Sequence, residues 1–126
     1  MYARSGRQAP PLALRAMTVD LQGAFRALAD PTRRQILMDL STRDMTIGEV
    51  VEQFDITRGA VKKHLTILEQ GKLISVHSAG RTRINKLEPL GLKSVLDWIN
   101  YFDRFWDDRL GDLKNAIERE TGNNNV

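Results

Sequence analysis

The sequence predicts a mainly α-helical fold that is organised around a helix-turn-helix and continues into a two-stranded β-hairpin and a long C-terminal helix. Three observations predict it. Residues 46–70 form two short amphipathic segments, each with its own helix start signal. Residues 73–87 hold two short strand-like segments around a glycine turn, and residues 89–120 keep apolar side chains at helical spacing.

Length and composition narrow the classes of protein that fit. The 126 residues suffice for one domain with one modest core, which we place at residues 18–120. The chain has no cysteine, so disulfides and thiolate metal sites are excluded, and a reducing compartment fits. No apolar run approaches the roughly 18 residues that a membrane span needs, and no signal peptide is visible. We expect a soluble, cytoplasmic protein that does not bind membranes.

The N-terminal segment, residues 1–17, contains glycine, two prolines and three arginines without helical or strand periodicity, so we expect a disordered arm. Met17 stands just ahead of the first helical pattern, and we hypothesise that translation starts there rather than at Met1. The intact mass of the natively expressed protein distinguishes the two starts. Residues 121–126 are expected to form a flexible tail.

Two helices are predicted before the helix-turn-helix. The first covers residues 18–29. Asp30 is the expected N-cap of the second helix and Pro31 its first residue, where the missing N–H costs nothing. The apolar positions of the two helices are Leu21, Ala24, Phe25, Leu28, Ile36, Leu37 and Leu40.

The helix-turn-helix carries a start signal for each of its helices. Thr46 and Glu49 have the spacing of a capping box. Thr57 is the expected N-cap of the second helix, with Ile56 and Val61 spaced as a hydrophobic staple. The second helix has an apolar face formed by Ala60, Val61, His64, Leu65, Ile67 and Leu68. Its other face consists of Arg58, Gly59, Lys62, Lys63, Thr66, Glu69 and Gln70.

A small, polar and basic helix face suits the major groove of DNA, because cations meet phosphates while short side chains let the backbone approach base edges. The alternative is an ordinary solvated surface helix. The charge distribution favours DNA: residues 57–86 hold seven cations against Glu69 alone, a net charge of +6, whereas residues 89–126 hold five cations and seven anions, or −2.

Two stretches resemble a known family. Residues 28–37, LADPTRRQIL, resemble the opening signature of the ArsR family of bacterial winged-helix repressors, and residues 60–74, AVKKHLTILEQGKLI, continue the match. The resemblance covers roughly residues 20–115. It implies a winged helix-turn-helix fold, DNA as partner, and a homodimer that forms through the first and last helices.

The predicted hairpin, with segments 73–78 and 83–87 around a turn at 79–82, follows a left-handed C-cap expected at Gly71. In a winged helix the tip of this wing contacts the DNA backbone or the minor groove; the alternative is an exposed turn whose arginines serve solubility.

We assign base reading to Arg58 and Lys62, which can donate to O6 and N7 of guanine. The predicted DNA-binding residues are Thr57, Arg58, Gly59, Lys62, Lys63, Thr66, Arg81 and Arg83.

The predicted C-terminal helix, residues 89–120, carries five of the eight aromatic residues. They represent on the order of 1,000 Å², more than soluble monomers leave exposed in one patch, so we expect a second copy of the chain to cover part of them. Arg109 lies on the same face of this helix as its apolar side chains. It either pairs with an acid across the dimer or snorkels, with its charged end in solvent. The predicted dimer interface is Leu21, Phe25, Leu28, Val95, Trp98, Ile99, Phe102, Phe105, Trp106, Leu110, Leu113 and Ile117.

No metal site and no cofactor are expected. Many ArsR relatives sense metals through cysteines on the first helix of the helix-turn-helix or through histidines and acids on the last helix, but residues 46–54 lack cysteine and the last helix lacks histidine. Carboxylates alone are poor zinc or copper sites. His64 is expected to be a hydrogen-bonded core histidine and His77 to be solvated. Residues 98–110 further resemble regulators often encoded beside small START-like proteins.

The predicted function is a homodimeric repressor of transcription that binds a palindromic operator. An enzyme is not expected, because no catalytic arrangement, glycine-rich phosphate loop or metal cluster is present in the sequence. Two alternatives remain: a winged helix that binds protein rather than DNA, and a repressor released by a small molecule bound near the dimer interface.

Overall fold

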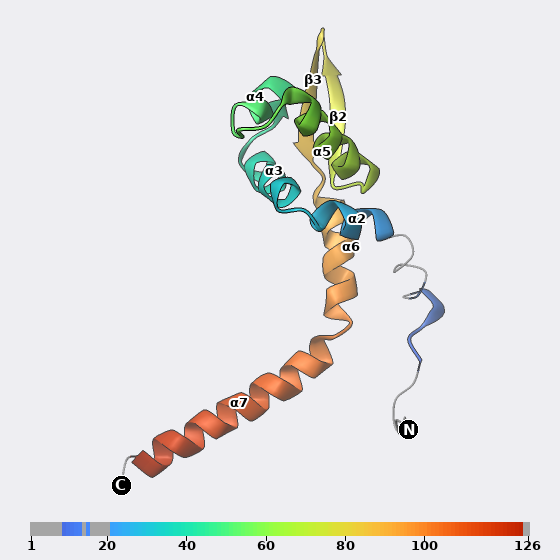
Figure 1. Ribbon diagram of the computed structural model, residues 1–126. Coiled ribbons are helices and arrows are strands. Elements are labelled where there is room, and N and C mark those ends of the chain that lie inside the picture. The colour runs from blue at the N-terminus through green and yellow to red at the C-terminus, as the bar shows by residue number, and fades with distance from the viewer. Residues whose placement is uncertain (1–8, 14, 16–20, 125–126) are drawn as a thin grey trace. The chain divides into compact units, whose positions relative to one another are not determined.

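The computed structural model describes residues 9–13, 15 and 21–124 (Figure 1). The first of two compact units ends at Val95 and the second begins at Leu96. The elements are α2 (Gln22–Leu28), α3 (Pro31–Thr42), β1 (Met45–Thr46), α4 (Ile47–Val51), α5 (Arg58–Gln70), β2 (Ile74–Ala79), β3 (Thr82–Leu87), α6 (Pro89–Asn100) and α7 (Asp103–Asn124). Within these residues no helix combines the length and apolar character needed to cross a membrane.

The start of α3 agrees with the sequence prediction. Asp30 is the N-cap, its Oδ2 accepts the N–H of Arg33 at 3.1 Å, and Pro31 is the first helical residue. The preceding helix α2 is shorter than the predicted span, of which residues 18–20 lie outside the described residues. Of the predicted N-terminal arm, residues 1–8, 14, 16 and 17 also lie outside them. Leu12, Ala13 and Arg15 are helical, which the sequence did not predict.

The sheet has three antiparallel strands in the order β1-β3-β2, one more than the predicted hairpin. Strand β1 pairs Met45 with Asn85, and the buried Asn85 side chain donates from Nδ2 to the Met45 carbonyl at 3.2 Å. A strand of two residues is too short to show an alternating pattern, which is why the sequence did not reveal it. Its pairing joins the start of the helix-turn-helix to the hairpin.

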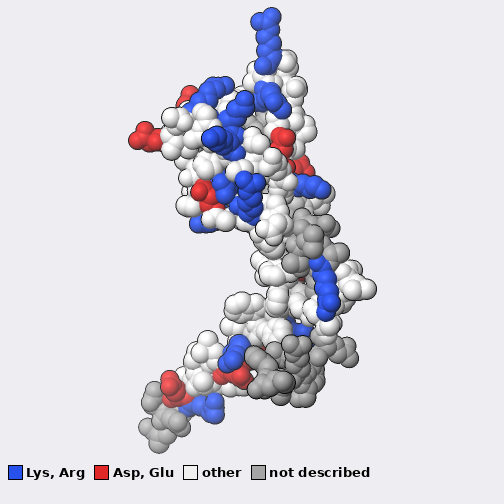
Figure 2. All heavy atoms as spheres, turned by 45° about the vertical axis from the view of Figure 1, so that its right-hand side comes forward, with Lys and Arg blue, Asp and Glu red and all other residues white. Residues whose placement is uncertain are grey.

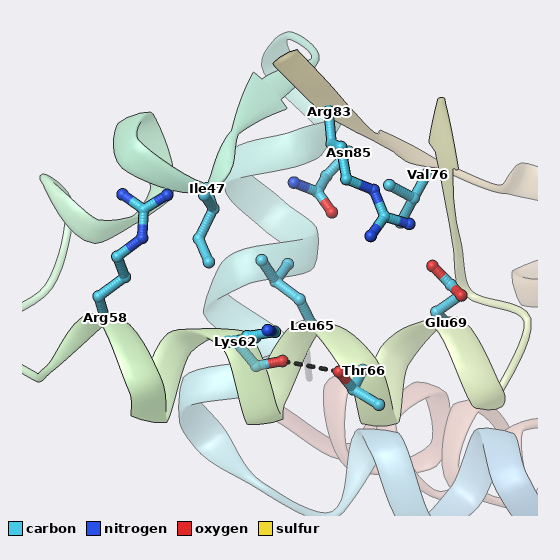
Figure 3. A pocket seen from close by; sticks show the side chains of 9 residues that line it. All are labelled: Ile47, Arg58, Lys62, Leu65, Thr66, Glu69, Val76, Arg83 and Asn85. Carbon is cyan, nitrogen blue, oxygen red and sulfur yellow. Dashed lines mark hydrogen bonds between the residues drawn. The ribbon is translucent and has the colours of Figure 1, made fainter. Parts of the chain in front are cut away.

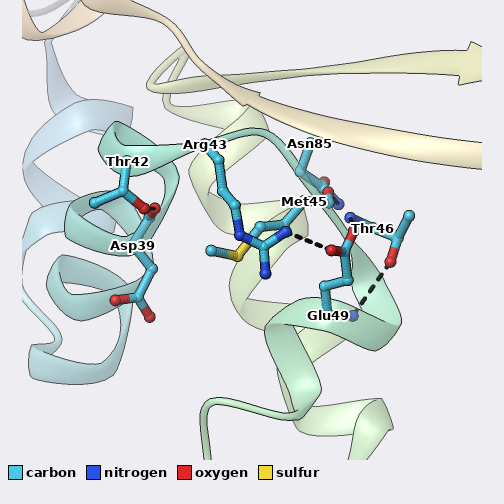
Figure 4. Close-up of polar contacts among 7 residues, drawn as sticks. All are labelled: Asp39, Thr42, Arg43, Met45, Thr46, Glu49 and Asn85. Carbon is cyan, nitrogen blue, oxygen red and sulfur yellow. Dashed lines mark hydrogen bonds and ion pairs between the residues drawn. The ribbon is translucent and has the colours of Figure 1, made fainter.

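The capping box at the start of α4 is confirmed (Figure 4). The Glu49 N–H donates to Thr46 Oγ1 at 3.2 Å, and the Thr46 N–H donates to Glu49 Oε1 at 3.0 Å. Arg43 donates to the other carboxylate oxygen of Glu49. The backbone hydrogen bond from Thr46 is the main cause that lowers the pKa of Glu49, and the Arg43 hydrogen bond adds to it. This cluster fixes the entry into the helix-turn-helix.

Helix α5 starts at the predicted N-cap, because Thr57 Oγ1 accepts the Ala60 N–H at 3.1 Å. Its end differs from the prediction of a left-handed Gly71. Gly71 is right-handed with φ −79°, and the left-handed residue is Lys72, with φ 61°. The Leu73 N–H donates to the Leu68 carbonyl at 3.0 Å, so α5 closes with a Schellman motif one residue later than expected.

Close backbone contact explains why residue 71 is glycine. A Cβ added to Gly71 would lie 2.7 Å from the carbonyl oxygen of Gly23 in α2. A Cβ at Gly91, in the first turn of α6, would lie 2.1 Å from the carbonyl oxygen of Lys72. Main-chain atoms of α2 therefore contact the C-cap of α5, and main-chain atoms in the first turn of α6 contact the turn that follows α5.

The core of the first unit lies between α2, α3, α4, α5 and the sheet. The predicted inward residues of α3 are buried there together with Val61, Leu65 and Leu68 from the apolar face of α5. Each fully buried aliphatic side chain contributes about 1.5–3 kcal/mol relative to an exposed one. The largest fully buried side chains are Ile36, Val50, Val61, Leu68 and Leu73.

The prediction of one continuous helix over residues 89–120 is wrong. Helix α6 ends at Asn100 and α7 begins at Asp103; the Tyr101 N–H donates to the Trp98 carbonyl at 3.2 Å, which closes α6 with a tight turn. Residues 100–103 are Asn, Tyr, Phe and Asp, all weaker helix formers than Ala or Leu, which favours a break there. The helix α7 also extends into the predicted flexible tail, as far as Asn124.

Candidate nucleic-acid interface

The predicted DNA-binding side chains lie on two elements of the first unit. Thr57 caps α5, and five of the others belong to that helix, whereas Arg81 is in the hairpin turn and Arg83 is on β3. All eight residues are exposed. Lysine and arginine side chains gather over α5 and along the hairpin up to its tip (Figure 2). The two-residue turn Gly80–Arg81, with Gly80 at φ +65°, presents the arginine at that tip.

A hollow of about 320 Å³ separates α5 from the hairpin. We call it the helix–hairpin hollow. Arg58 and Lys62 reach it from α5, and Arg83 reaches it from β3 (Figure 3). The full lining is Ile47, Arg58, Lys62, Leu65, Thr66, Glu69, Val76, Arg83 and Asn85. Three cations from two elements thus converge on one concave, partly apolar surface.

The structure separates the predicted set into two groups. Arg58, Lys62, Thr66 and Arg83 line the helix–hairpin hollow. The remaining four, which are Thr57, Gly59, Lys63 and Arg81, do not line it. The difference within α5 follows from helical spacing, because residues four apart share a face.

The two threonine hydroxyls already have intramolecular partners. Thr57 Oγ1 accepts the Ala60 N–H, and Thr66 Oγ1 donates to the Lys62 carbonyl at 2.9 Å. A hydroxyl that has donated its proton still offers acceptor lone pairs but no second donor. The positively charged hydrogen-bond donors that line the helix–hairpin hollow are the side chains of Arg58, Lys62 and Arg83.

Sequence reasoning missed two lining residues that have a clear place in the geometry. Glu69 follows Lys62 by seven positions on α5, a spacing that indicates the same face. That signal was available in the sequence. Asn85 gave no signal, because its role depends on the unpredicted strand β1, whose Met45 carbonyl it binds.

Arg33 lies on α3 and connects it to the end of α2 and to α5. Its Nε donates to the Ala27 carbonyl at 2.8 Å and its Nη2 to the Arg26 carbonyl at 2.9 Å, at the end of α2. Its Nη1 lies 3.3 Å from Nδ1 of His64 on α5. His64 is thus a partly buried, hydrogen-bonded histidine, as predicted. His77 is exposed, as predicted, and its Nε2 lies 2.8 Å from Ser75 Oγ.

Comparison with known proteins places this arrangement in a family. The model of the bacterial regulatory protein arsR family matches residues 30–76. The transcriptional repressor SdpR of Bacillus subtilis (strain 168) is 37% identical over 82 residues, which are 65% of this chain and 91% of SdpR. The chain belongs to the ArsR family. It is a transcriptional regulator with a winged helix-turn-helix DNA-binding domain, in which α5 is the recognition helix and β2–β3 the wing.

Two solved structures agree with this fold. The ArsR family transcriptional regulator RHA00566 has a TM-score of 0.65 at 35% identity, over 70% of this chain and 97% of that one. The winged helix-turn-helix domain of Mb0332 from Mycobacterium bovis, described as homodimeric, has a TM-score of 0.59. At 16% identity, over 74% of this chain and 88% of that one, it shows the fold alone. The predicted mainly α-helical, winged helix-turn-helix fold is confirmed.

The predicted dimer residues of this ArsR protein fall into three groups by exposure. Leu21 and Val95 are buried within the single chain, at 6% and 8% exposure, so they belong to its core. Phe25, Leu28, Trp98 and Phe102 are half-buried. The six exposed members are Ile99, Phe105, Trp106, Leu110, Leu113 and Ile117, at 40–59% exposure. We call these six the apolar stripe.

Two exposed arginines, Arg104 and Arg109, lie among the aromatic residues of the second unit. Arg104 lies 5.2 Å from the ring centroid of Tyr101 and 5.0 Å from that of Phe105, and its Nη2 donates to the Tyr101 hydroxyl at 3.1 Å. Across the described residues, no three His, Cys, Asp or Glu side chains lie close enough together to hold a metal ion.

Proposed function

We propose that this ArsR protein is a homodimeric repressor that binds a palindromic operator and acts in the cytoplasm. The main support for the proposal is that Arg58 and Lys62 of the recognition helix and Arg83 of the wing line the same helix–hairpin hollow. Such a pair of elements can engage a groove and the adjoining phosphates at once. The relative SdpR is itself a transcriptional repressor.

The apolar stripe supports the dimer. Five of its six side chains follow helical spacing along α7, Ile99 belongs to α6, and all six are about half exposed, for example Trp106 at 59% and Leu110 at 58%. Large apolar patches on soluble proteins mark interfaces more often than free surface. A twofold dimer would present two recognition helices to half-sites about one turn apart, on the order of 10 base pairs or a multiple.

We further propose that release from DNA does not use a cysteine metal site and that the protein has no catalytic activity. The chain has no cysteine, and the relatives found are transcriptional regulators. The signal is then a small molecule bound near the dimer interface, or the protein's own concentration. The resemblance of residues 98–110 to regulators encoded beside START-like proteins points to a neighbouring gene as the target.

Fluorescence anisotropy tests the proposal. A duplex from upstream of the protein's own gene is compared with a scrambled duplex at about 50 and 150 mM salt, because nonspecific attraction falls steeply with ionic strength. We expect the native duplex to keep a hundredfold advantage or more at the higher salt. Arg58→Ala is expected to reduce that advantage, whereas Lys114→Ala, which removes one cation that does not line the helix–hairpin hollow, leaves it unchanged.

Two results would contradict the proposal. Weak and equal binding of both duplexes, followed by a genome-wide selection that enriches no sequence, would favour the protein-binding alternative. A species that remains monomeric at micromolar concentration would contradict the homodimer.

A further inference from the structure

Glu69 occupies an unusual place for an acid. It is exposed in the last turn of α5 and lines the helix–hairpin hollow together with the three cations (Figure 3). It also lines a second, adjacent hollow of about 480 Å³. Three residues line both hollows: Glu69, Val76 and Arg83. Glu69 thus lies between two concave surfaces on the side of α5 that faces the wing.

Among the described residues, the carboxylate of Glu69 takes part in no hydrogen bond or ion pair that would stabilise the fold. The polar partners of Glu69 are backbone groups: its carbonyl accepts the Lys72 N–H at 2.9 Å and also the Gly71 N–H. It is also the only acidic residue in residues 57–86. No hydrogen bond or ion pair within the described residues therefore explains why a carboxylate lies beside Arg58, Lys62 and Arg83.

On a surface that binds DNA, this carboxylate acts against phosphate. Phosphate oxygens only accept hydrogen bonds and carry negative charge, so they are repelled by Glu69 and attracted by the three cations. The major groove, in contrast, offers amino donors on base edges: N4 of cytosine and N6 of adenine. A carboxylate can accept from them, as Glu and Asp do from cytosine.

From this placement we propose that Glu69 is a specificity-determining residue. Its carboxylate accepts a hydrogen bond from the amino group of a cytosine or adenine at one position of each half-site, and it raises the cost of sequence-independent contact with phosphate. The three cations then supply attraction and Glu69 supplies discrimination. The inference rests on the proposed DNA-binding function and adds a residue and a base chemistry to it.

Selection from a pool of random duplexes tests this inference. Wild type, Glu69→Gln and Glu52→Gln are each used to enrich bound DNA, after circular dichroism has shown that all three fold. Glu52→Gln is the matched control, because Glu52 is exposed at the end of α4 and lines neither hollow. We expect Glu69→Gln to lose preference for a cytosine or adenine at one position per half-site, and Glu52→Gln to keep the wild-type consensus.

Anisotropy on the selected duplex gives the size of the effect. Changing the identified base pair should weaken wild-type binding roughly five- to a hundredfold, and Glu69→Gln should remove most of that penalty. The same variant should bind an unrelated duplex a few-fold more tightly than wild type, because one repelling charge per protomer is gone.

A second variant pair separates direct base contact from an effect through Arg83. If Glu69 only positions the Arg83 side chain, Glu69→Gln changes nothing in an Arg83→Ala background, and the inference is overturned. Persistence of the lost base preference in that background supports it. Identical consensus sequences for wild type and Glu69→Gln overturn the inference alone. No consensus for wild type overturns the proposed function, and the inference with it.

Discussion

Single polar side chains cap the starts of several helices in this chain, and Asp30 is an example. Its carboxylate accepts the Arg33 N–H at the start of α3. That backbone hydrogen bond is the largest cause of the lowered pKa of Asp30; burial opposes it, and the charge of Arg33 adds to it. A carboxyl group with a lowered pKa stabilises the folded state in its ionised form.

The pH dependence of stability should show this contribution. Because the folded-state pKa of Asp30 is lowered, its contribution is present above the ordinary value of about 3.9 and is lost as the pH falls through the lower folded value. We predict that the unfolding free energy of Asp30→Asn falls less steeply than that of wild type between about pH 5 and pH 3. Urea unfolding at a series of pH values measures it.

Asparagine is the informative replacement because it is as good an N-cap as aspartate, so only the titration is removed. Asp30→Ala removes the cap as well and should cost about 1 kcal/mol at pH 7. Parallel pH profiles for wild type and Asp30→Asn would show that Asp30 does not contribute to acid unfolding.

Gly71 gives a second prediction at this scale. Gly71→Ala should destabilise the protein by about 1–3 kcal/mol, because the new Cβ would meet the Gly23 carbonyl oxygen at 2.7 Å, where only backbone can yield. Gly48→Ala is the control, since its Cβ would have an ordinary contact at 3.8 Å with Thr46 Oγ1. Thermal unfolding compares them, and equal melting temperatures for the two variants would refute the close-contact explanation.

At the scale of elements, the wing and the recognition helix have different expected parts in DNA binding. The wing presents Arg81 at a two-residue turn, outside the lining of the helix–hairpin hollow, whereas Arg83 lies inside it. An arginine at a hairpin tip has reach but little support from neighbouring side chains. Phosphate contact, which needs charge more than fixed geometry, suits that place.

We predict that Arg81→Ala weakens binding to operator and unrelated duplexes by the same factor. If each protomer loses one phosphate contact, the slope of log affinity against log salt should become shallower by about 1.8 per dimer. Anisotropy over a range of salt concentrations gives that slope for both duplexes. A change in sequence preference with an unchanged slope would instead make Arg81 a base reader.

The elements that the sequence predicted well are those set by local chemistry. Capping at Thr46, Thr57 and Asp30 depends on residues three positions away, so spacing alone reveals it. The features that were missed depend on distant parts of the chain. Strand β1 exists because β3 pairs with it, and residue 71 is glycine because the main chain of α2 contacts it.

The same distinction holds for the candidate site. Helix α5 could be assigned a basic face from its sequence, and four predicted residues do line one hollow. Which cations meet across the hollow could not be predicted, because the approach of Arg83 to the side of α5 is set by the sheet. Asn85 belongs to the site for the same reason, through its bond to Met45.

For the whole molecule, the apolar stripe makes assembly testable. Leu110→Lys should shift wild-type dimer toward monomer and weaken operator binding tenfold or more, because a charge would be buried in the interface and the two half-sites would no longer be bound together. Asn115→Lys is the control: it introduces the same charge on α7 at a position five residues away, off the stripe. Sedimentation equilibrium reads the mass, and a dimer that tolerates Leu110→Lys would place the interface elsewhere.

The glycine contacts at the end of α5 have a mechanical consequence. Packed helices usually meet through side chains, whose rotamers can absorb small displacements, but at Gly71 and Gly91 the main chains meet directly. The turn that ends the recognition helix is therefore held by main-chain contacts against α2 and the first turn of α6. We expect a small shift of either neighbour to displace the end of the recognition helix as well.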